Sequence, residues 1–242
     1  MLLAVAVVVL VVGVTAVSVA VVSNSKPSLD SRVGTSPVAG GEPTPDPSPR
    51  PEAFPGGPRV SFYGDSYTLG TGASSADRRW STIISTERGW NEFNPSVNGL
   101  GFVNNRSIFG AGDVPDLVGR STPDIVFITM GLNDNFSYDR ASMDIDKQIT
   151  SDFDRLKKAL PDARFIVVEP FWYTDERPES LGVISGWVKD AAVSIGANYI
   201  PGASHWIEGH PEWMADDGLH PNDEGYAEMA KRMDAELTKL GL

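Results

Sequence analysis

Short runs of β-branched and aromatic residues alternate with helical patterns across residues 59–242, and this alternation permits few architectures. The predicted strands lie at 59–63, 91–97, 124–130, 164–171 and 198–201. The predicted helices lie at 80–88, 114–120, 143–160, 181–195 and 223–240. Strands that are joined by helix-length connections pair in parallel, and helices then cover both faces of the sheet. We therefore predict an α/β fold, a three-layer α/β/α sandwich with a five-stranded parallel sheet.

Ahead of this domain, residues 1–22 form an uncharged apolar run that only Gly13, Thr15 and Ser18 interrupt. As a helix, the run would reach roughly 33 Å, which is enough to cross a hydrocarbon core of about 30 Å. The run is longer than the apolar stretch of a usual signal peptide and lacks its basic head, so we favour a transmembrane anchor. A cleaved export signal is the alternative, because residues 18–20 offer a small-x-small cleavage site.

Residues 23–58 hold nine of the 18 prolines, with serine, threonine and glycine between them. This composition is typical of a disordered, extended linker. Lys26 and Arg32 follow the apolar run, and the positive-inside rule taken literally would keep the domain in the cytoplasm. Proline-rich spacers commonly hold a domain away from a membrane, however. We therefore expect residues 59–242 to lie outside the cell, either anchored by residues 1–22 or secreted after their cleavage.

The formal net charge of −12 and the absence of cysteine exclude several classes of function. An acidic protein lacks the basic surface that nucleic acid requires, so we expect no nucleic-acid partner. Without cysteine, a disulfide framework, a zinc-thiolate site and a cysteine nucleophile are impossible. His205 and His210 have no set of carboxylates at ligand spacing, so we expect no metal and no other cofactor. We expect the domain to be monomeric.

Four polar clusters follow predicted strands or precede the last helix, at 64–68, 94–101, 131–134 and 217–222. Ligands of open α/β sheets bind beyond the carboxyl ends of the strands, so we expect these clusters to meet at one edge. They include Ser66, His220 and Asp217, which supply the hydroxyl, the base and the orienting carboxylate that serine acyl transfer requires. Asp217 precedes His220 by three residues and can reach one imidazole nitrogen, which fixes the tautomer.

The same clusters offer donors for the oxyanion that acyl transfer creates. The amide of Ser66 lies at a predicted helix start, where amides have no helical acceptor. Gly99 offers an amide without a side chain in front of it, and Gly101 is a competing candidate two residues later. Asn133 offers a neutral side-chain amide. Asp65 and Asp134 are interpreted as structural residues of these loops.

In residue types and order, these clusters resemble the SGNH (GDSL-type) hydrolase family over most of residues 59–242. The matching segments are Gly64-Asp65-Ser66, the 94–99 loop, Gly131-Leu132-Asn133-Asp134 and Asp217-Gly218-Leu219-His220. The resemblance implies a flavodoxin-like sandwich that hydrolyses esters. It also implies that Ser66 is the nucleophile, His220 the base and Asp217 its partner. By the same resemblance, the amides of Ser66 and Gly99 and the side chain of Asn133 form the oxyanion hole.

We therefore expect a serine esterase that works through an acyl-enzyme. Its expected substrates carry short acyl groups on an envelope glycan or lipid, an inference from location alone. An O-acyltransferase that uses the same acyl-enzyme and a non-catalytic glycan-binding module are the alternatives. Residues 171–173, an aromatic run at the end of the fourth predicted strand, either line a substrate pocket or pack in the core.

Overall fold

The computed structural model describes residues 53–109 and 112–242. The predicted anchor at 1–22 and most of the predicted linker at 23–58 lie outside the described residues, so the structure does not address them. Within the described part of the chain, no helix is both long enough and apolar enough to span a bilayer.

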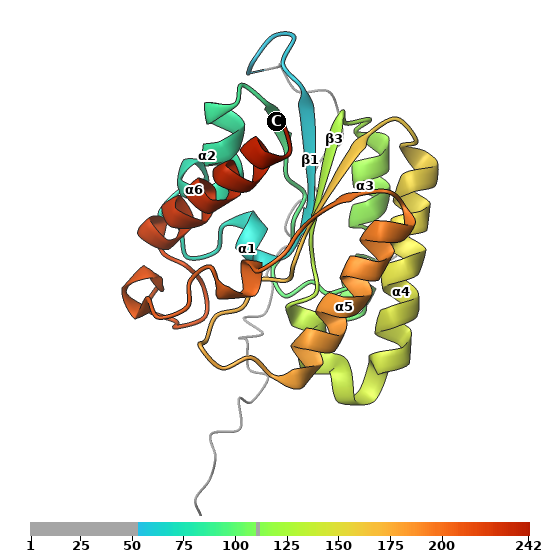
Figure 1. The fold of residues 1–242 in the computed structure, drawn as a ribbon, viewed down its shortest axis with the longest axis vertical. Helices are drawn as coiled ribbons and strands as arrows, with labels where there is room; N and C mark the ends of the chain where they lie inside the picture. The colour runs from blue at the N-terminus through green and yellow to red at the C-terminus, as the bar shows by residue number, and fades with distance from the viewer. Residues whose placement is uncertain (1–52, 110–111) are drawn as a thin grey trace, which may run out of the picture. The chain divides into compact units, whose positions relative to one another are not determined.

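One parallel sheet forms the centre of the domain, with the strand order β2-β1-β3-β4-β5 (Figure 1). Its strands are β1 (Arg59–Gly64), β2 (Asn91–Phe93), β3 (Ile125–Thr129), β4 (Arg164–Val168) and β5 (Asn198–Ile200). In the register of the sheet, Val60 of β1 faces Glu92 of β2 on one side and Ile125 of β3 on the other. The predicted five-stranded parallel sheet is confirmed.

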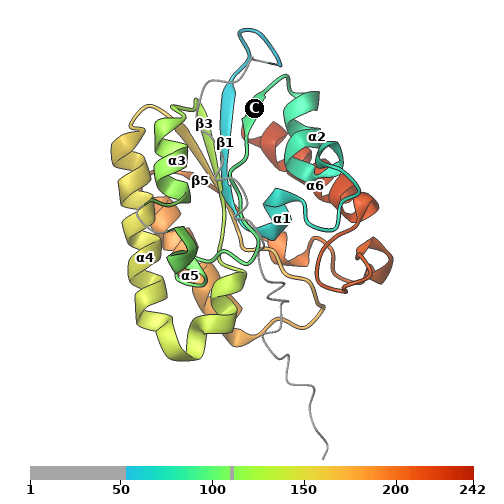
Figure 2. The ribbon, with the colours of Figure 1, turned by 180° about the vertical axis from the view of Figure 1, so that it is seen from behind.

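Helices cover both faces of the sheet, as Figure 2 also shows from behind. The helices α2 (Trp80–Glu87) and α6 (Asp223–Lys239) lie on one face, and α3 (Val114–Arg120), α4 (Tyr138–Ala159) and α5 (Glu179–Ser194) lie on the other. Alternate residues of β3 enter the two cores: Phe127 packs in the core on the α2 and α6 face, and Ile128 in the core of the other three helices. Every residue of β3 is buried, which is typical of a central parallel strand.

Three elements differ from the prediction by three or more residues at one end, and the others by at most two. Strand β2 ends at Phe93 rather than at 97, because Asn94 turns its side chain to donate to the Thr68 carbonyl at 2.7 Å. The next residue, Pro95, has no amide hydrogen for a ladder. Strand β4 ends at Val168 rather than at 171. Helix α4 begins at Tyr138 rather than at 143, and its first turn is separated from the rest by non-helical backbone at Ala141.

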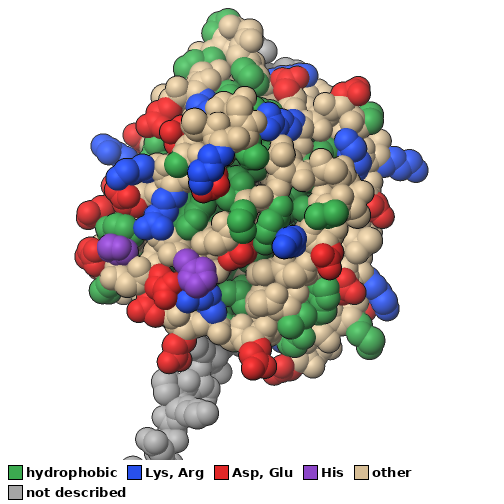
Figure 3. Space-filling view, viewed as in Figure 1, with side chains coloured by type: hydrophobic (Ala, Val, Ile, Leu, Met, Phe, Trp, Pro, Cys, Tyr) green, Lys and Arg blue, Asp and Glu red, His purple; other side chains and the backbone are tan. Residues whose placement is uncertain are grey.

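Charged side chains of both signs are interspersed on the face shown in Figure 3. On that face, the described residues form no broad basic surface of the kind that a nucleic-acid backbone requires.

Candidate active site

Ser66 is the first residue of the short helix α1 (Ser66–Leu69), directly beyond the carboxyl end of β1. Asp65 caps this helix, because its carboxylate accepts the Tyr67 amide at 3.0 Å. Gly64 makes the turn possible: a Cβ there would lie 2.5 Å from the Thr129 hydroxyl. The Ser66 amide has no helical acceptor at this position. No hydrogen bond from it occurs within residues 53–109 and 112–242.

His220 and Asp217 lie together in the loop that precedes α6. Nδ1 of His220 and Oδ2 of Asp217 are 2.7 Å apart. The other oxygen of Asp217 accepts the backbone amides of Leu219 and His220, each at 2.9 Å. Gly218 permits this tight loop by adopting a φ of +62°. The contact on Nδ1 leaves Nε2 of the imidazole as the nitrogen available to a second partner.

The charge of Asp217 is favoured by these contacts. Partial burial acts to raise the pKa of its carboxyl, but hydrogen bonds from the His220 ring and from two amides outweigh this effect and hold the pKa below its ordinary value. An ionised Asp217 accepts a proton-bearing Nδ1, so Nε2 is then unprotonated in the neutral ring.

The structure brings the Ser66 turn and the His220 loop together at the carboxyl edge of the sheet. The Tyr67 hydroxyl donates to the carbonyl of Leu219 at 2.8 Å, and the Tyr67 and His220 rings are 6.1 Å apart between centroids. Across the described residues, Ser66 Oγ and His220 Nε2 form no hydrogen bond with each other. Catalytic hydrogen bonds commonly tighten only when substrate is bound.

The backbone distinguishes between the two glycines that were candidates for the oxyanion hole. The Gly101 amide already donates to the Asn104 carbonyl at 2.9 Å, whereas the Gly99 amide donates to nothing within the described segments. Gly99 adopts a φ of +69°, a conformation that favours glycine. Of the two amides, that of Gly99 is therefore the one available to a further acceptor.

Asn133 follows β3 and lies at the start of a 3₁₀ turn, Asn133–Ser137. Its Nδ2 donates to the Leu100 carbonyl at 3.0 Å and contacts the Asp65 carboxylate at 3.4 Å. The shorter bond fixes the amide beside the Gly99 loop. The longer one is weak for a hydrogen bond.

Asp134 is structural, as its sequence context suggested. Its carboxylate accepts three successive amides, from Phe102 at 2.7 Å, Val103 at 2.9 Å and Asn104 at 3.3 Å. Burial raises the pKa of this carboxyl although the three amides oppose the rise. Asp134 therefore anchors the loop that carries Gly99.

The remaining histidines pair locally. Nδ1 of His205 is 2.5 Å from Glu208, and Nδ1 of His210 is 2.8 Å from Glu212 while its ring stacks on Trp213. Among residues 53–109 and 112–242, no three histidine, aspartate or glutamate side chains come together as a metal site.

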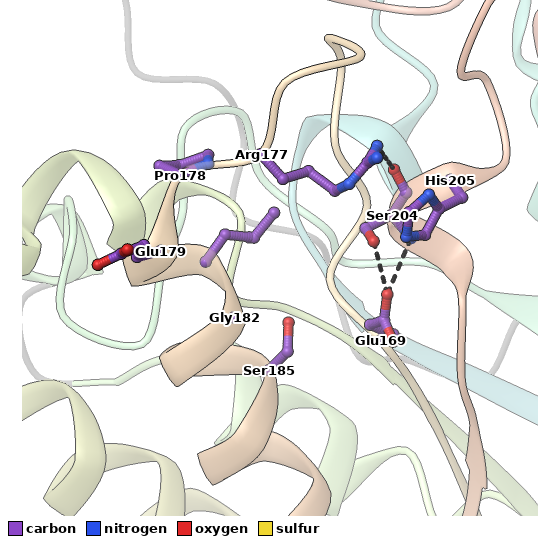
Figure 4. A pocket seen from close by; sticks show the side chains of 9 residues that line it. Glu169, Arg177, Pro178, Glu179, Gly182, Ser185, Ser204 and His205 are labelled. Atoms are coloured by element: carbon purple, nitrogen blue, oxygen red, sulfur yellow. Dashed lines mark hydrogen bonds between the residues drawn. The ribbon is translucent and has the colours of Figure 1, made fainter.

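A cavity of about 440 Å³ lies away from these residues, between the start of α5 and residues 204–205 (Figure 4). Glu169, Arg177, Ser204 and His205 are among its lining residues. One Glu169 oxygen accepts the Ser204 hydroxyl at 2.6 Å and the other accepts the Gly202 amide at 2.9 Å, while Arg177 pairs with Glu208 at 3.1 Å. These charged groups already have partners, and none of the predicted site residues lines the cavity.

The first two residues of the aromatic run 171–173 pack in the core. Phe171 is a core residue, 2% exposed, and stacks on Tyr67 with centroids 5.7 Å apart. Trp172 is also buried, and its indole nitrogen donates to the Glu176 carbonyl at 2.8 Å. Tyr173 is half-buried.

Two residues near the site were missed in the sequence. Tyr67 and Tyr226 are buried, and their hydroxyls join the Ser66 turn to the His220 loop and α6. The position of Tyr67 next to Ser66 was the only local signal. The position of Tyr226 on the buried face of the last helix indicated packing but not a hydroxyl partner.

Comparisons with known proteins show the family of this chain and its fold. Residues 62–228 match the model of the GDSL-like Lipase/Acylhydrolase family. A GDSL lipase of Mycobacterium tuberculosis is 26% identical over 189 residues, which cover 72% of this chain and 79% of that protein.

Solved structures show the same fold. The psychrotrophic esterase EstA from Pseudoalteromonas has a TM-score of 0.58 at 15% identity, covering 75% of this chain and 97% of that one. A mutant of Axe2, an acetyl-xylooligosaccharide esterase from Geobacillus, has a TM-score of 0.57 at 18% identity, covering 77% of this chain and 95% of that one.

Proposed function

Because the chain belongs to the GDSL-like lipase/acylhydrolase family, whose fold and ester-hydrolase activity it shares, we propose that Ser66, His220 and Asp217 are its catalytic triad. The observation that carries this proposal is the 2.7 Å contact between His220 Nδ1 and Asp217, in a loop bonded to the residue that follows Ser66. This contact supports Nε2 as the base, and the bond from Tyr67 to Leu219 supports a position of the loop close to Ser66.

The proposed reaction has two steps. Ser66 Oγ attacks the ester carbonyl while His220 Nε2 takes the hydroxyl proton, and Asp217 stabilises the resulting imidazolium. The imidazolium then donates this proton to the departing alcohol oxygen, which leaves an acyl-enzyme. Water attacks the acyl-enzyme with His220 again acting as base, and the collapse of the second intermediate releases the acid and restores Ser66.

The oxyanion of each tetrahedral intermediate is held in this proposal by three neutral donors: the amides of Ser66 and Gly99 and the side chain of Asn133. Preorganised donors of this kind stabilise developing charge without needing to reorganise. The two amides have no other acceptor within the described residues, which supports this role. Asn133 would exchange its 3.4 Å contact with Asp65 for the oxyanion.

The proposed substrates are short acyl esters on a glycan or lipid of the cell envelope, and the domain is proposed to act outside the cell. Two observations support this proposal. The apolar run at 1–22 and the proline-rich stretch at 23–58 are suited to tethering a domain near a membrane. The similar structure from Geobacillus is named an acetyl-xylooligosaccharide esterase, which provides a precedent for an acylated sugar.

Turnover of p-nitrophenyl acetate and labelling by a fluorophosphonate probe test the triad. Ser66→Ala is expected to lower kcat by at least about 10³-fold and to abolish labelling. Ser85→Ala is the matched control, because the buried Ser85 hydroxyl lies on α2 and has no hydrogen-bond partner among residues 53–109 and 112–242. Equal rates in Ser66→Ala and the wild type would remove Ser66 from the chemistry.

Loss of one proposed oxyanion donor should lower kcat less than loss of the Ser66 hydroxyl. Asn133→Ala is expected to lower kcat by about 10²–10³-fold on the same substrate. A decrease of less than a few-fold would assign Asn133 to the support of the loop alone.

A further inference from the structure

Two segments of the chain carry the proposed nucleophile and the proposed base: residues 66–74 and residues 217–226. Each contains a buried tyrosine that donates a hydrogen bond to the backbone of the other. The Tyr67 hydroxyl donates to the carbonyl of Leu219, the residue before His220, at 2.8 Å. The Tyr226 hydroxyl donates to the carbonyl of Thr71 at 2.7 Å and lies 3.5 Å from that of Ser66. The two bonds therefore connect the segments in both directions.

Both tyrosines are placed to make these bonds durable. Tyr67 is 1% exposed and Tyr226 is fully buried. Burial raises the pKa of both phenols well above the ordinary value, and nearby charges on Asp65 and Asp217 act in the same direction. The hydroxyls consequently remain donors through the neutral and alkaline range. The two bonds themselves are part-buried, because the acceptor residues Thr71 and Leu219 are more exposed than the tyrosines.

Further contacts between the same segments reinforce this connection. The amide and the hydroxyl of Ser74 donate to the two carboxylate oxygens of Asp223, at 2.7 and 2.6 Å. Gly72 lies so close to the second segment that a Cβ there would be 2.5 Å from the Pro221 carbonyl. The Thr71 hydroxyl also donates to the side chain of Asn98, the neighbour of Gly99. Thr71 thus connects the Tyr226 bond to the loop that carries a proposed oxyanion donor.

The base loop is held by hydrogen bonds at its ends but is exposed at its tip: the Ala215 amide donates to the His220 carbonyl and the Asn222 amide to the Trp213 carbonyl, each at 2.8 Å. Asp217, Gly218 and Asp216 are exposed, and the isolated bridge from Met214 to Pro221 is its one strand-like pairing in the described chain. A loop of this kind can shift by an ångström when a tether is lost. Such a shift changes the distance from Nε2 to the nucleophile, to which serine chemistry is sensitive.

We propose that Tyr67 and Tyr226 are positioning residues that hold His220 in register with Ser66. We call the pair the tyrosine clasp. The proposal rests on the proposed triad and adds two residues to the reaction that do not touch the substrate. Removal of either hydroxyl is expected to slow the chemical step and to leave ground-state binding of the substrate almost unchanged.

A third buried tyrosine provides a control that distinguishes a positioning role in catalysis from a contribution to stability alone. Tyr63 is also fully buried, and its hydroxyl donates to Asp152 at 2.7 Å in the core under α4. Tyr63→Phe removes this buried hydrogen bond and the one that the Tyr63 hydroxyl accepts from Arg106 at 3.1 Å, and neither bond joins the catalytic segments. It is therefore the matched control for Tyr67→Phe and Tyr226→Phe, all of which keep the aromatic ring.

The experiment compares kcat and KM for p-nitrophenyl acetate in these three variants, in the wild type and in Ser66→Ala, at a temperature where circular dichroism shows every protein folded. Tyr67→Phe and Tyr226→Phe are expected to lower kcat by about 10–100-fold with KM within about twofold of the wild type, since a 1 Å displacement can cost about 10²-fold. Tyr63→Phe is expected to keep its kcat although it unfolds at a lower temperature.

Hydrogen–deuterium exchange supplies a readout that is independent of turnover. Tyr67→Phe is expected to speed exchange in residues 217–222, and Tyr226→Phe in residues 66–74, so that each change appears on the opposite segment. Wild-type kcat in both tyrosine variants, or exchange that is unchanged on the opposite segment, overturns the clasp. Equal loss of kcat in Tyr63→Phe also overturns it. Full activity in Ser66→Ala overturns the proposed triad and the clasp together, whereas an inactive Ser66→Ala beside fully active tyrosine variants overturns the clasp alone.

Discussion

Asp65 lies between β1 and Ser66 in the sequence, and its contacts give it a structural role. It is 1% exposed and caps α1 through the Tyr67 amide. Burial raises the pKa of its carboxyl to about 7, the Tyr67 hydrogen bond opposes this rise, and the charge of Asp134 adds to it. The carboxyl is therefore partly protonated near neutral pH, which makes it unsuited to act as a permanently charged partner of His220.

This shift predicts a pH dependence of stability. The pKa of Asp65 is about 7 in the folded protein and about 3.9 in an unfolded chain, so the folded state binds more protons between these values. Its contribution to stability is present below pH 4 and is lost as the pH rises through 7. Relative to Asp65→Asn, the wild type should lose on the order of 4 kcal/mol of unfolding free energy between pH 4 and 8.

Urea unfolding of both proteins across this range measures the difference. Asp65→Asn is the suitable reference, because an amide oxygen can still accept the Tyr67 amide while the side chain does not titrate. Parallel stability curves for the two proteins would show that Asp65 is not protonated in the folded state.

Site residues that lie close in sequence were the easiest to predict. Asp217 and His220 are three residues apart, and a short loop is enough to join them as expected. The sequence favoured Gly99 over Gly101 by resemblance alone, because the bond that occupies the Gly101 amide, to the Asn104 carbonyl, is seen only in the structure. The hydrogen bond of the Tyr226 hydroxyl could not be predicted either, since its acceptor Thr71 lies 155 residues earlier in the sequence.

At the scale of elements, the loop after β2 shows why Gly101 is needed although its amide is not free. A Cβ at Gly101 would lie 2.6 Å from both carboxylate oxygens of Asp134, whose position is fixed by three loop amides. The glycine therefore lets the loop close over Asp134 and sets the position of Gly99.

Gly101→Ala is accordingly predicted to destabilise the protein by about 1–3 kcal/mol, because the added methyl group must displace the loop or the carboxylate. It should also lower kcat by at least about 10-fold, since the displaced loop carries a proposed oxyanion donor. Gly186→Ala in α5 is the matched control: its Cβ would meet nothing within 4 Å, so it should stabilise the helix by about 0.5–1 kcal/mol and leave kcat unchanged. Thermal unfolding and p-nitrophenyl acetate turnover measure both effects, and equal behaviour of the two variants would contradict the prediction.

The lengths of elements were predictable where hydrophobic periodicity continues to the end, as in α2 and α6. They were not predictable where a side chain competes with the ladder. Asn94 is such a residue, because it donates to Thr68 instead of extending β2. The early start of α4 was hidden for a different reason: the non-helical backbone at Ala141 interrupts the periodicity near its first turn.

At the scale of the whole molecule, the order of the strands explains how one edge gathers residues from distant parts of the chain. β1 and β3 are adjacent in the centre of the sheet, so the loops after them bring Ser66 and Asn133 together. The final loop reaches the same edge, where Tyr67 binds Leu219 across 152 positions of sequence. Alternation of strands and helices predicted this convergence, because parallel strands end at the same side. The contacts that fix the final distances depend on side-chain packing and were not predictable.

One side chain of β2 holds residues 54–57. Asn91 accepts the Phe54 amide at 2.9 Å and donates to the carbonyls of Phe54 and Gly57 at 2.8 and 3.0 Å. A protein of residues 53–242 retains these bonds, whereas one of residues 59–242 loses all three. The shorter protein should be less stable by about 1–3 kcal/mol, since each net hydrogen bond contributes about 1 kcal/mol. Thermal unfolding compares them, and identical midpoints would show that residues 53–58 do not contribute to stability.

A protein of residues 53–242 also allows catalysis and membrane attachment to be tested separately. All of the proposed catalytic residues lie within residues 53–242, so this protein should hydrolyse p-nitrophenyl acetate with the kcat of the full chain. The apolar run at 1–22 is long enough to cross a bilayer, and a span of this kind resists extraction by carbonate. In fractionated bacterial cells, the full chain should therefore remain with carbonate-washed membranes while residues 53–242 stay in the soluble fraction. Recovery of the full, uncleaved chain in the soluble fraction would argue against an anchor, and a shortened product there would favour the cleaved signal instead.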